Sequence, residues 1–409
     1  MLRKRIGLAA QAISASSKFQ KGVAYIPRVR RSTLSPKQLP SSPYLGKLAP
    51  ELVSDILDQI FELLTQPSDD DILYSLQAYP NLYNCMLVNK KWCETAVRIL
   101  YKHPWRLHRL YTLRKTDLAY DRCGLVRLYL TMLDREQRLV LLEQGINLPD
   151  PERTPRFKYA SYLRCLDYGV MLESIWTIYS QSHYTYIPCE KVKLVVGALL
   201  KLFSTQAGSL TWLRFAPMSF SFDEMYFEML ADKEFNALLR PVEHLVIEAN
   251  LGGCVKLYKL FSANFRNVRN LELTDLPRAR NWLGDSSIKC QTEFTAVIES
   301  QHHLQSLTLK ECAGYLSSII SAILSQSHTI SHLKFIDCDF RGCEPWVGLS
   351  KCRQLISIEF GGCINISGAM IAPLVDAGLT RLKKVVVWNR TDQKACKELM
   401  SWASVYRSI

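Results

Sequence analysis

The sequence predicts an α/β protein in which a small helical module precedes a solenoid with a curved parallel sheet and outer helices. In the second part of the chain, the spacing apolar-x-x-apolar-x-apolar recurs eight times. In the first part, two segments place apolar residues three or four positions apart, which aligns them on one side of a helix. A segment with three prolines, 148–157, lies between these parts and marks the predicted domain boundary. The predicted segments are a basic tail, a helical module, a helical linker and a repeat domain, at residues 1–46, 47–108, 109–159 and 160–409.

The positive charge of the chain is concentrated at its N-terminus. The formal net charge is +13, and residues 1–47 contribute ten basic side chains and no acidic one. The remaining 362 residues therefore carry only +3, the difference between +13 and +10. A nucleic-acid-binding protein needs a basic face on its folded body. The composition therefore argues against nucleic acid as a partner of the folded body.

The tail at residues 1–46 is interpreted as a solvated, disordered segment of a cytoplasmic or nuclear protein. Two targeting signals are the alternatives. An acid-free composition rich in Arg and Ser suits a mitochondrial presequence, and the tracts RKR and RVRR suit a nuclear import signal. Imaging the chain with and without residues 1–46 distinguishes these alternatives.

The helical module begins with a predicted helix over residues 48–64, in which Pro50 occupies the first turn. A second helix is predicted over residues 84–105. Its buried side is expected to contain Cys85, Val88, Trp92, Ala96 and Ile99. Three short helices cannot bury all of their apolar residues internally, so an exposed patch that binds a partner is expected.

These two segments resemble an F-box, the small helical module that docks on the Skp-family adaptor of cullin–RING ubiquitin ligases. The matching residues are Leu48, Pro50, Glu51, Leu52, Ile56, Ile60, Phe61, Leu87, Val88, Asn89, Lys91 and Trp92. The chain departs from the family pattern at Ala49, where the family has proline, and in a longer spacer between the helices. The resemblance implies that one set of residues forms the adaptor-binding patch or its supporting core. That set is Leu48, Pro50, Leu52, Ile56, Leu87, Val88 and Trp92.

The linker is predicted to be helical over residues 125–145, with Gly145 as its C-cap. The buried side of this helix is expected to contain Leu125, Leu128, Tyr129, Met132 and Leu139.

The repeats are predicted to begin at eight apolar residues. These are Leu163, Leu210, Val242, Val268, Leu304, Ile330, Leu355 and Leu382. Three repeats have cysteine at the ninth place, namely Cys312, Cys338 and Cys363, where a small side chain that bonds to neighbouring backbone is needed. The pattern resembles the cysteine-containing class of leucine-rich repeats, which implies a strand, a turn and a helix in each repeat.

The residues between the apolar positions of each strand are expected to point away from the repeat core, toward the concave face of the solenoid. We interpret this face as a protein-binding surface because Trp and Arg are frequent interface anchors. The candidate substrate-binding residues are Trp212, Arg214, His244, Glu248, Glu272, Lys310, Lys334, Glu359 and Trp388.

The sequence contains no catalytic motif that we recognise. It has no Gly-rich phosphate loop, no H-E-x-x-H and no G-x-S-x-G. His328 and His332 are four residues apart, but His332 falls in a predicted strand, so a metal site on one helix is not expected. The 13 cysteines include no C-x-x-C pair, which favours reduced thiols. We therefore expect no enzyme activity, cofactor, metal or membrane association.

An F-box followed by leucine-rich repeats resembles the substrate-recognition subunits of SCF-type cullin–RING ubiquitin ligases. The resemblance implies a Skp-family adaptor as one partner and an unidentified protein substrate as the other. The alternative is a repeat scaffold that binds proteins without any ubiquitin ligase. A third interpretation is a nucleic-acid binder that acts through the basic tail.

Overall fold

The computed structural model describes residues 50–65, 82–105, 122–150, 155–179, 190–216, 233–249, 255–275, 286–313, 316–388 and 400–401. The predicted tail, Leu48 and most of the spacer between the first two helices lie outside these residues. The chain divides into the units Met1–Pro50 and Glu51–Ile409. Apart from Pro50, all described residues belong to the second unit.

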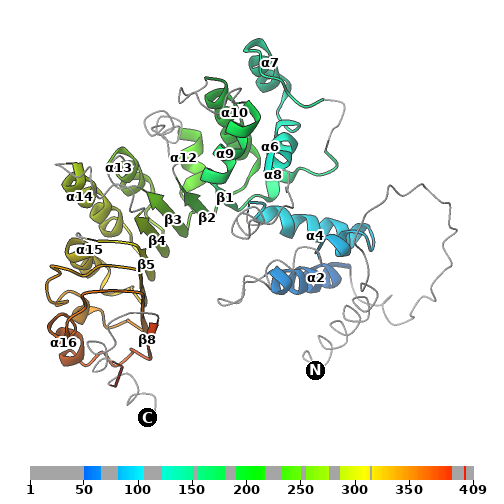
Figure 1. Ribbon diagram of the computed structural model, residues 1–409. Coiled ribbons are helices and arrows are strands. Elements are labelled where there is room, and N and C mark those ends of the chain that lie inside the picture. Colours follow the sequence, from blue (N-terminus) through cyan, green and yellow to red (C-terminus); the bar gives the residue numbers. More distant parts are fainter. Residues whose placement is uncertain are drawn as a thin grey trace, which may run out of the picture. The chain divides into compact units, whose positions relative to one another are not determined.

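The second unit contains one sheet of eight parallel strands in chain order (Figure 1). The strands are β1 (Cys165–Asp167), β2 (Trp212–Phe215), β3 (His244–Ala249), β4 (Asn270–Asp275), β5 (Ser306–Lys310), β6 (His332–Ile336), β7 (Ser357–Gly361) and β8 (Lys384–Trp388). Each strand begins two residues after a predicted repeat start, and the first residues of all eight strands are paired in register. The α/β class and the positions of the strands are therefore confirmed.

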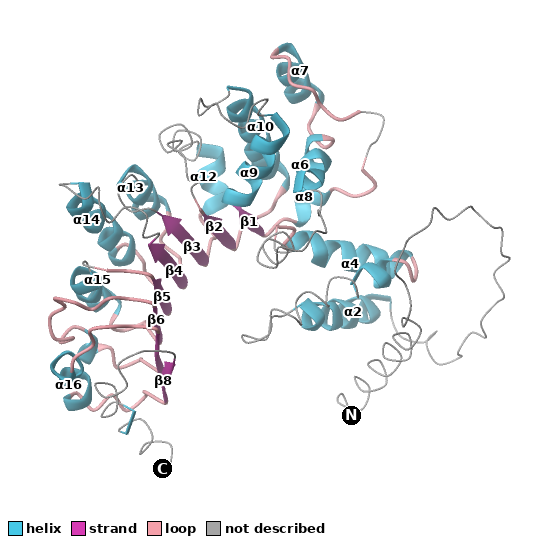
Figure 2. Cartoon of the chain, viewed as in Figure 1, coloured by secondary structure: helices cyan, strands magenta, loops and turns pink. Residues whose placement is uncertain are grey.

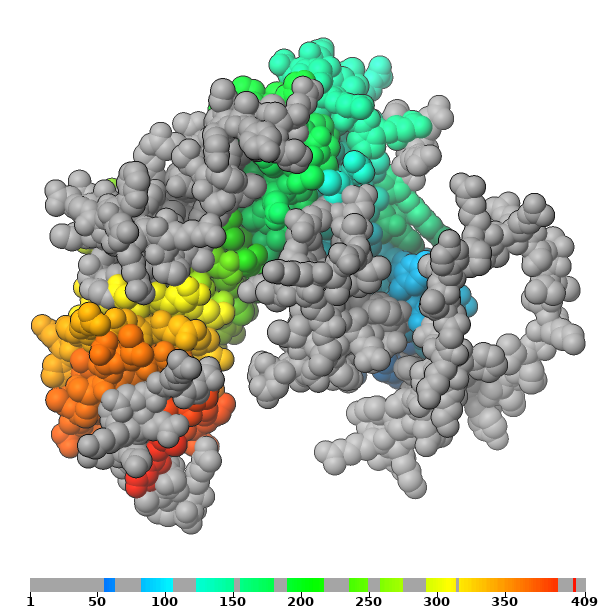
Figure 3. Space-filling model, viewed as in Figure 1, coloured from blue at the N-terminus to red at the C-terminus, as the bar shows by residue number. Residues whose placement is uncertain are grey.

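Helices or short 3₁₀ turns connect most of the strands and cover one face of the sheet (Figure 2). They are α9 (Tyr168–Tyr179), α10 (Glu190–Gln206), α12 (Lys233–Leu239), α13 (Val255–Asn264), α14 (Ser286–Glu299), α15 (Leu316–Ile323), η4 (Leu324–Gln326), η5 (Leu349–Lys351) and α16 (Gly368–Asp376). In the space-filling view, the visible described residues run in sequence order from green through yellow and orange to red (Figure 3). None of the described helices has the length and apolar character that a membrane-spanning helix requires.

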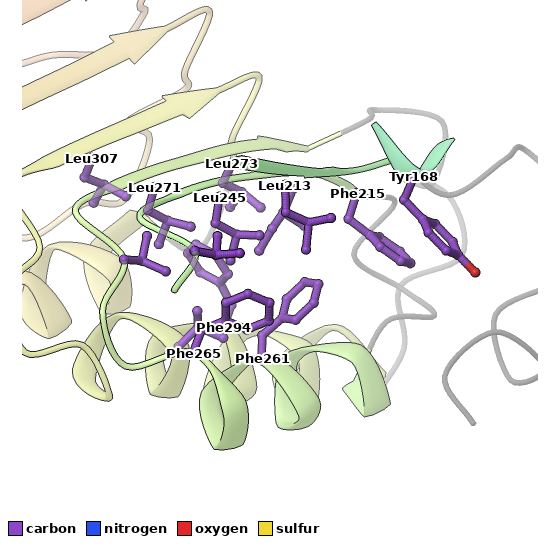
Figure 4. Packing of buried hydrophobic residues seen from close by; sticks show 14 of the residues in the cluster. Tyr168, Leu213, Phe215, Leu245, Phe261, Phe265, Leu271, Leu273, Phe294 and Leu307 are labelled. Atoms are coloured by element: carbon purple, nitrogen blue, oxygen red, sulfur yellow. The ribbon is translucent and has the colours of Figure 1, made fainter. Parts of the chain in front are cut away.

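The core lies between the sheet and these helices. Leu245 and Leu271 of neighbouring strands point toward Phe261 of α13 and Phe294 of α14 (Figure 4). All eight predicted repeat starts are buried in this core. Because each repeat contacts mainly its neighbours, the core continues from one repeat to the next.

The three repeat cysteines lie one above another in the core, and all are fully buried. The Cys338 Sγ donates to the Leu309 carbonyl of the preceding repeat at 3.5 Å, and the Cys363 Sγ donates to the Phe335 carbonyl at 3.4 Å. Hydrogen bonding between neighbouring thiols, together with burial, raises the pKa of Cys338 and of Cys363. These cysteines are therefore structural thiols that bond to neighbouring backbone, as the spacing predicts.

The prediction of one continuous linker helix over residues 125–145 is wrong. Two helices form instead, α6 (Arg122–Leu130) and α7 (Arg135–Glu143). Asp134 starts α7 with a capping box: its side chain accepts from the Gln137 backbone N–H at 2.8 Å, and the Gln137 side chain accepts from the Asp134 N–H at 3.2 Å. The break rotates the second helix, so Leu139 is 49% exposed instead of buried. Gly145 has the positive φ of +66° that a C-cap glycine adopts.

The linker helices share the core of the repeats. Tyr129 of α6 is buried and packs edge-on against Phe203 of α10, with ring centroids 5.0 Å apart. Leu133 and Leu141 belong to the same cluster. Buried side chains from both sides of the proline-rich segment 148–157 therefore form one continuous core.

Candidate protein-docking surfaces

The first candidate surface belongs to a unit of three helical segments with a small core of its own. The segments are α2 (Pro50–Thr65), residues 82–86, and α4 (Lys90–Lys102). Their core residues are Leu57, Phe61, Leu82, Cys85, Ala96 and Ile99, with Ile60, Met86 and Trp92 packed against them. Phe61 and Trp92 meet edge to face, with ring centroids 5.5 Å apart. This core is separate from the core of the repeats.

The predicted helix over residues 84–105 is interrupted, which changes the position of Val88. The first segment ends at Met86, and α4 starts at Lys90. Asn89 between them has an extended backbone, and its side chain accepts from the Trp92 N–H at 3.0 Å. An asparagine N-cap is favourable enough to start a new helix within an apolar periodicity. Val88 consequently lies in the turn and is exposed, whereas the periodicity predicted it to be buried.

The turn and the neighbouring helices carry four large exposed apolar side chains. Leu87 is 70% exposed, Tyr83 59%, Val88 58% and Ile56 43%. We refer to these four residues as the apolar patch. Tyr83 is absent from the predicted adaptor-binding residues, although its spacing of four residues from Leu87 could have indicated it.

The other predicted adaptor-binding residues have different positions. Trp92 is half-buried in the small core, so it supports the unit from inside. Pro50 and Leu52 belong to α2, but their side chains, like the whole of Leu48, lie outside the described residues.

Ion pairs join α2 to α4 within this unit, and the residues at and after the last turn of α4 connect the unit to the sheet. Asp58 and Glu62 of α2 pair with Arg98 and Lys102 of α4, the second pair at 3.0 Å. The Lys102 carbonyl accepts from the Arg164 N–H, directly before β1, at 3.1 Å. Trp105 is buried in the core of the repeats. The helical unit and the sheet are therefore joined by a packed segment.

The second candidate surface is the face of the sheet opposite the described helices, which we call the open face. The nine predicted substrate-binding residues lie on β2 to β8 at alternate positions of the strands. Every one of them is half-buried. Strand register aligns Arg214, Glu272, Lys334 and Glu359 in one row, and Trp212 and His244 in the row beside it.

Most charges on the open face are paired within the protein. Arg214 bonds Asp167 through Nη1 at 2.6 Å and Glu248 through Nε at 2.9 Å. Lys310 pairs with Glu272. Glu359 accepts from Lys384 at 2.7 Å and pairs with Lys334 at 3.4 Å. The candidate residues therefore form a surface whose net charge is close to zero. A partner has to match the arrangement of positive and negative side chains on this surface, because no net charge attracts it.

Burial alone would raise the pKa of Glu359, but the hydrogen bond from Lys384 and the charge of Lys334 lower it overall. The Lys334 Nζ also lies 5.3 Å from the Trp388 ring centroid, as in a cation–π contact.

Trp388 lies against Gly361 of the neighbouring strand, and a Cβ at that position would clash with the indole ring. We expect Gly361→Ala to displace Trp388, to lower the free energy of unfolding by about 1–3 kcal/mol and to shift the tryptophan fluorescence. Gly368→Ala is the matched control, since a Cβ there has no neighbour within 4 Å. Unchanged stability in Gly361→Ala would contradict this packing.

The stability of the protein is expected to depend on pH through His244. Burial lowers its pKa, and the charge of Glu272 raises it only in part. Below the usual value of about 6.5, the unfolded chain binds a proton that the folded chain does not, so stability falls as pH falls. We expect urea unfolding from about pH 7.5 to about pH 5 to show this slope, and His244→Gln to reduce it. Equal slopes in the two proteins would contradict the prediction.

The cysteine and histidine side chains that could take part in catalysis are buried in a core or bonded to a neighbouring strand. Burial raises the pKa of Cys85, so its thiol stays protonated at neutral pH. The His332 Nδ1 lies 2.7 Å from the Ser357 Oγ, and both residues belong to the open face. Among the residues that the structure describes, no group of three or more His, Cys, Asp or Glu side chains could hold a metal ion.

Comparison with known proteins gives no assignment: no family model matches the chain, and no curated protein matches it significantly.

Proposed function

We propose that this protein is a substrate-recognition subunit of an SCF-type cullin–RING ubiquitin ligase. The helical unit would act as an F-box that docks on the Skp-family adaptor, and the sheet as a leucine-rich-repeat domain that binds the protein to be ubiquitinated. One observation carries the proposal. The helical unit has its own core and leaves the apolar patch exposed, in a chain that also contains a parallel repeat sheet.

Exposed apolar residues on a small folded unit favour a protein partner over water. Leu87, Val88 and Ile56 belong to the residues that resemble the F-box pattern, and all three are exposed. Burial of a large apolar side chain in an interface contributes about 1.5–3 kcal/mol. Burial of the exposed parts of the apolar patch would therefore favour an adaptor complex.

Contacts between the end of the helical unit and the start of the repeat sheet support a role as a receptor with two connected binding surfaces. Tyr101 of α4 packs on Tyr159 of α8 (Tyr159–Tyr162), with ring centroids 4.2 Å apart, and His103 lies 3.4 Å from the Cys165 Sγ. In the proposed complex, the receptor performs no bond chemistry. It holds the substrate near a ubiquitin-charged enzyme and raises the effective concentration of the substrate lysine.

The alternative is a repeat scaffold without any ubiquitin ligase, in which the helical unit only caps the repeats. The burial of Trp105 in the core of the repeats favours a capping role for the segment directly after α4. It does not account for Leu87 and Val88, which remain 70% and 58% exposed.

Co-expression with a Skp-family adaptor tests the proposal. We expect the full chain and the adaptor to co-purify as a stable complex on size-exclusion chromatography. The control is the folding state of the chain, measured by circular dichroism and thermal unfolding. A folded chain that does not bind the adaptor would favour the scaffold.

A further inference from the structure

One edge of the sheet is formed by the segments that lead from a helix or 3₁₀ turn into the next strand. Because all eight strands are parallel, these segments lie at the same edge. We define the connector edge as the segments that enter β3 to β8. They are residues 240–243, 266–269, 300–305, 327–331, 351–356 and 377–383, the fifth of which includes Lys351, the last residue of η5. The exposed Glu299 and Asp376 end the helices directly before the third and sixth segments.

The connector edge is strongly basic. It contains seven Lys or Arg side chains and one acidic side chain, Glu243. The basic residues, all exposed, are Arg240, Arg266, Arg269, Lys351, Arg353, Arg381 and Lys383. The exposed His302, His303 and His328 lie among them. The fold thus gathers on one edge positive charge that is dispersed through the sequence.

Backbone hydrogen bonds place successive connectors side by side. The Gln305 N–H donates to the Arg269 carbonyl at 2.8 Å, and the Lys383 N–H donates to the Ile356 carbonyl at 2.9 Å. The Ser331 and Ile356 N–H groups continue the same ladder. Neighbouring strands of a sheet are about 4.8 Å apart. The Lys and Arg side chains therefore form two groups on this edge, one before β3 and β4 and one before β7 and β8, and the exposed histidines of the two connectors between them lie in the gap.

Most of this charge is not neutralised within the described part of the chain. Arg269 pairs with Glu243 at 3.6 Å. Within that part, the other four arginines and Lys351 form no ion pair. Cations are favourable at the C-terminal ends of helices, but among the arginines only Arg266 bonds a carbonyl there, that of Ser300 at 3.3 Å. The two groups of cations on the connector edge therefore attract an external anion.

We propose that the connector edge binds an acidic segment of a partner protein. Arginine binds carboxylates through two parallel hydrogen bonds, and five of the seven basic residues are arginines. Nucleic acid fits less well. The connector edge contains no Phe, Tyr or Trp on which bases could stack, and its short connectors project no helix or ribbon into a groove. The proposal does not depend on the proposed ligase function, because it uses neither the apolar patch nor the open face.

The experiment measures the binding of a fluorescein-labelled poly-glutamate peptide to the full chain by fluorescence anisotropy at low ionic strength. The test variant combines Arg240→Gln, Lys351→Gln and Arg353→Gln. The control variant combines Arg135→Gln, Lys158→Gln and Arg341→Gln, which are equally exposed cations away from the connector edge. An exposed ion pair contributes a factor of about two, so we expect about an eightfold loss of affinity in the test variant and none in the control.

Carbodiimide cross-linking of the same peptide locates the site, because it joins carboxylates to lysine amines. We expect cross-links at Lys351 and Lys383. Cross-links confined to the basic residues 1–47, or wild-type affinity of the test variant, would overturn the proposal. A short DNA duplex or phosphatidylserine vesicles that displace the peptide at a lower charge concentration than free poly-glutamate would overturn the choice of partner.

Discussion

Replacing both Leu87 and Val88 by aspartate is expected to weaken binding of the Skp-family adaptor by about 100-fold or more. The two side chains are 70% and 58% exposed, so the free protein loses little when they become polar. In the proposed complex they are buried, and two carboxylates without partners would then be taken out of water. The free energy of unfolding should change by no more than about 0.5 kcal/mol.

The measurement is isothermal titration calorimetry of adaptor with the wild-type and variant chains, after thermal unfolding has shown equal stability. Leu139→Asp on α7 is the matched control, because Leu139 is 49% exposed and lies outside the helical unit. Unchanged adaptor affinity in Leu87→Asp/Val88→Asp would contradict the docking proposal. Trp92→Ala is a poor test, because the loss of Trp92 from the small core destabilises the unit by about 3 kcal/mol.

The sheet could be predicted well from the sequence because each strand is specified by its own apolar spacing. Leu304 and Ile330, for example, each precede a strand by two residues, and Cys338 bonds to the repeat before it. Such signals are local and repeated. They do not depend on contacts between distant residues.

The helix breaks could not be predicted from periodicity, because polar caps override it. Asn89 and Asp134 each end an apolar pattern by bonding the backbone N–H of the residue three positions later. Apolar residues near each break, Val88 and Leu139, consequently lie exposed. Periodicity predicts which apolar residues share one side of a helix. The N-cap residue sets where a new helix starts, and so determines which of them face the core.

The electrostatics of both proposed binding surfaces arise from residues far apart in the sequence. Arg214 is 47 residues from Asp167 and 34 from Glu248, yet it bonds both. The connector edge similarly joins cations from four segments of a body whose net charge is small. The composition gives only the sum of these charges. The strand order shows which charged side chains lie close together.

Arg214→Met is expected to destabilise the protein by about 3 kcal/mol. The Asp167 side chain is 4% exposed and that of Glu248 17%. Removal of the guanidinium therefore leaves two carboxylates poorly hydrated and without their main partner. Urea unfolding measures the loss.

A triple variant separates the role of Arg214 in stability from a role in substrate binding. Asp167→Asn, Arg214→Met and Glu248→Gln together remove all three charges. The amide oxygen introduced by Asp167→Asn would still accept from the Val170 N–H, which lies 3.1 Å from the Asp167 carboxylate. Replacing a buried charge network by neutral groups of similar size is often nearly neutral, so the triple variant should recover most of the stability. A triple variant as unstable as Arg214→Met would contradict the ion-pair explanation. The hydrogen bonds of Arg214 are already directed to two carboxylates, so we expect the stable triple variant to keep its affinity for the substrate. Loss of that affinity would instead make Arg214 a recognition residue.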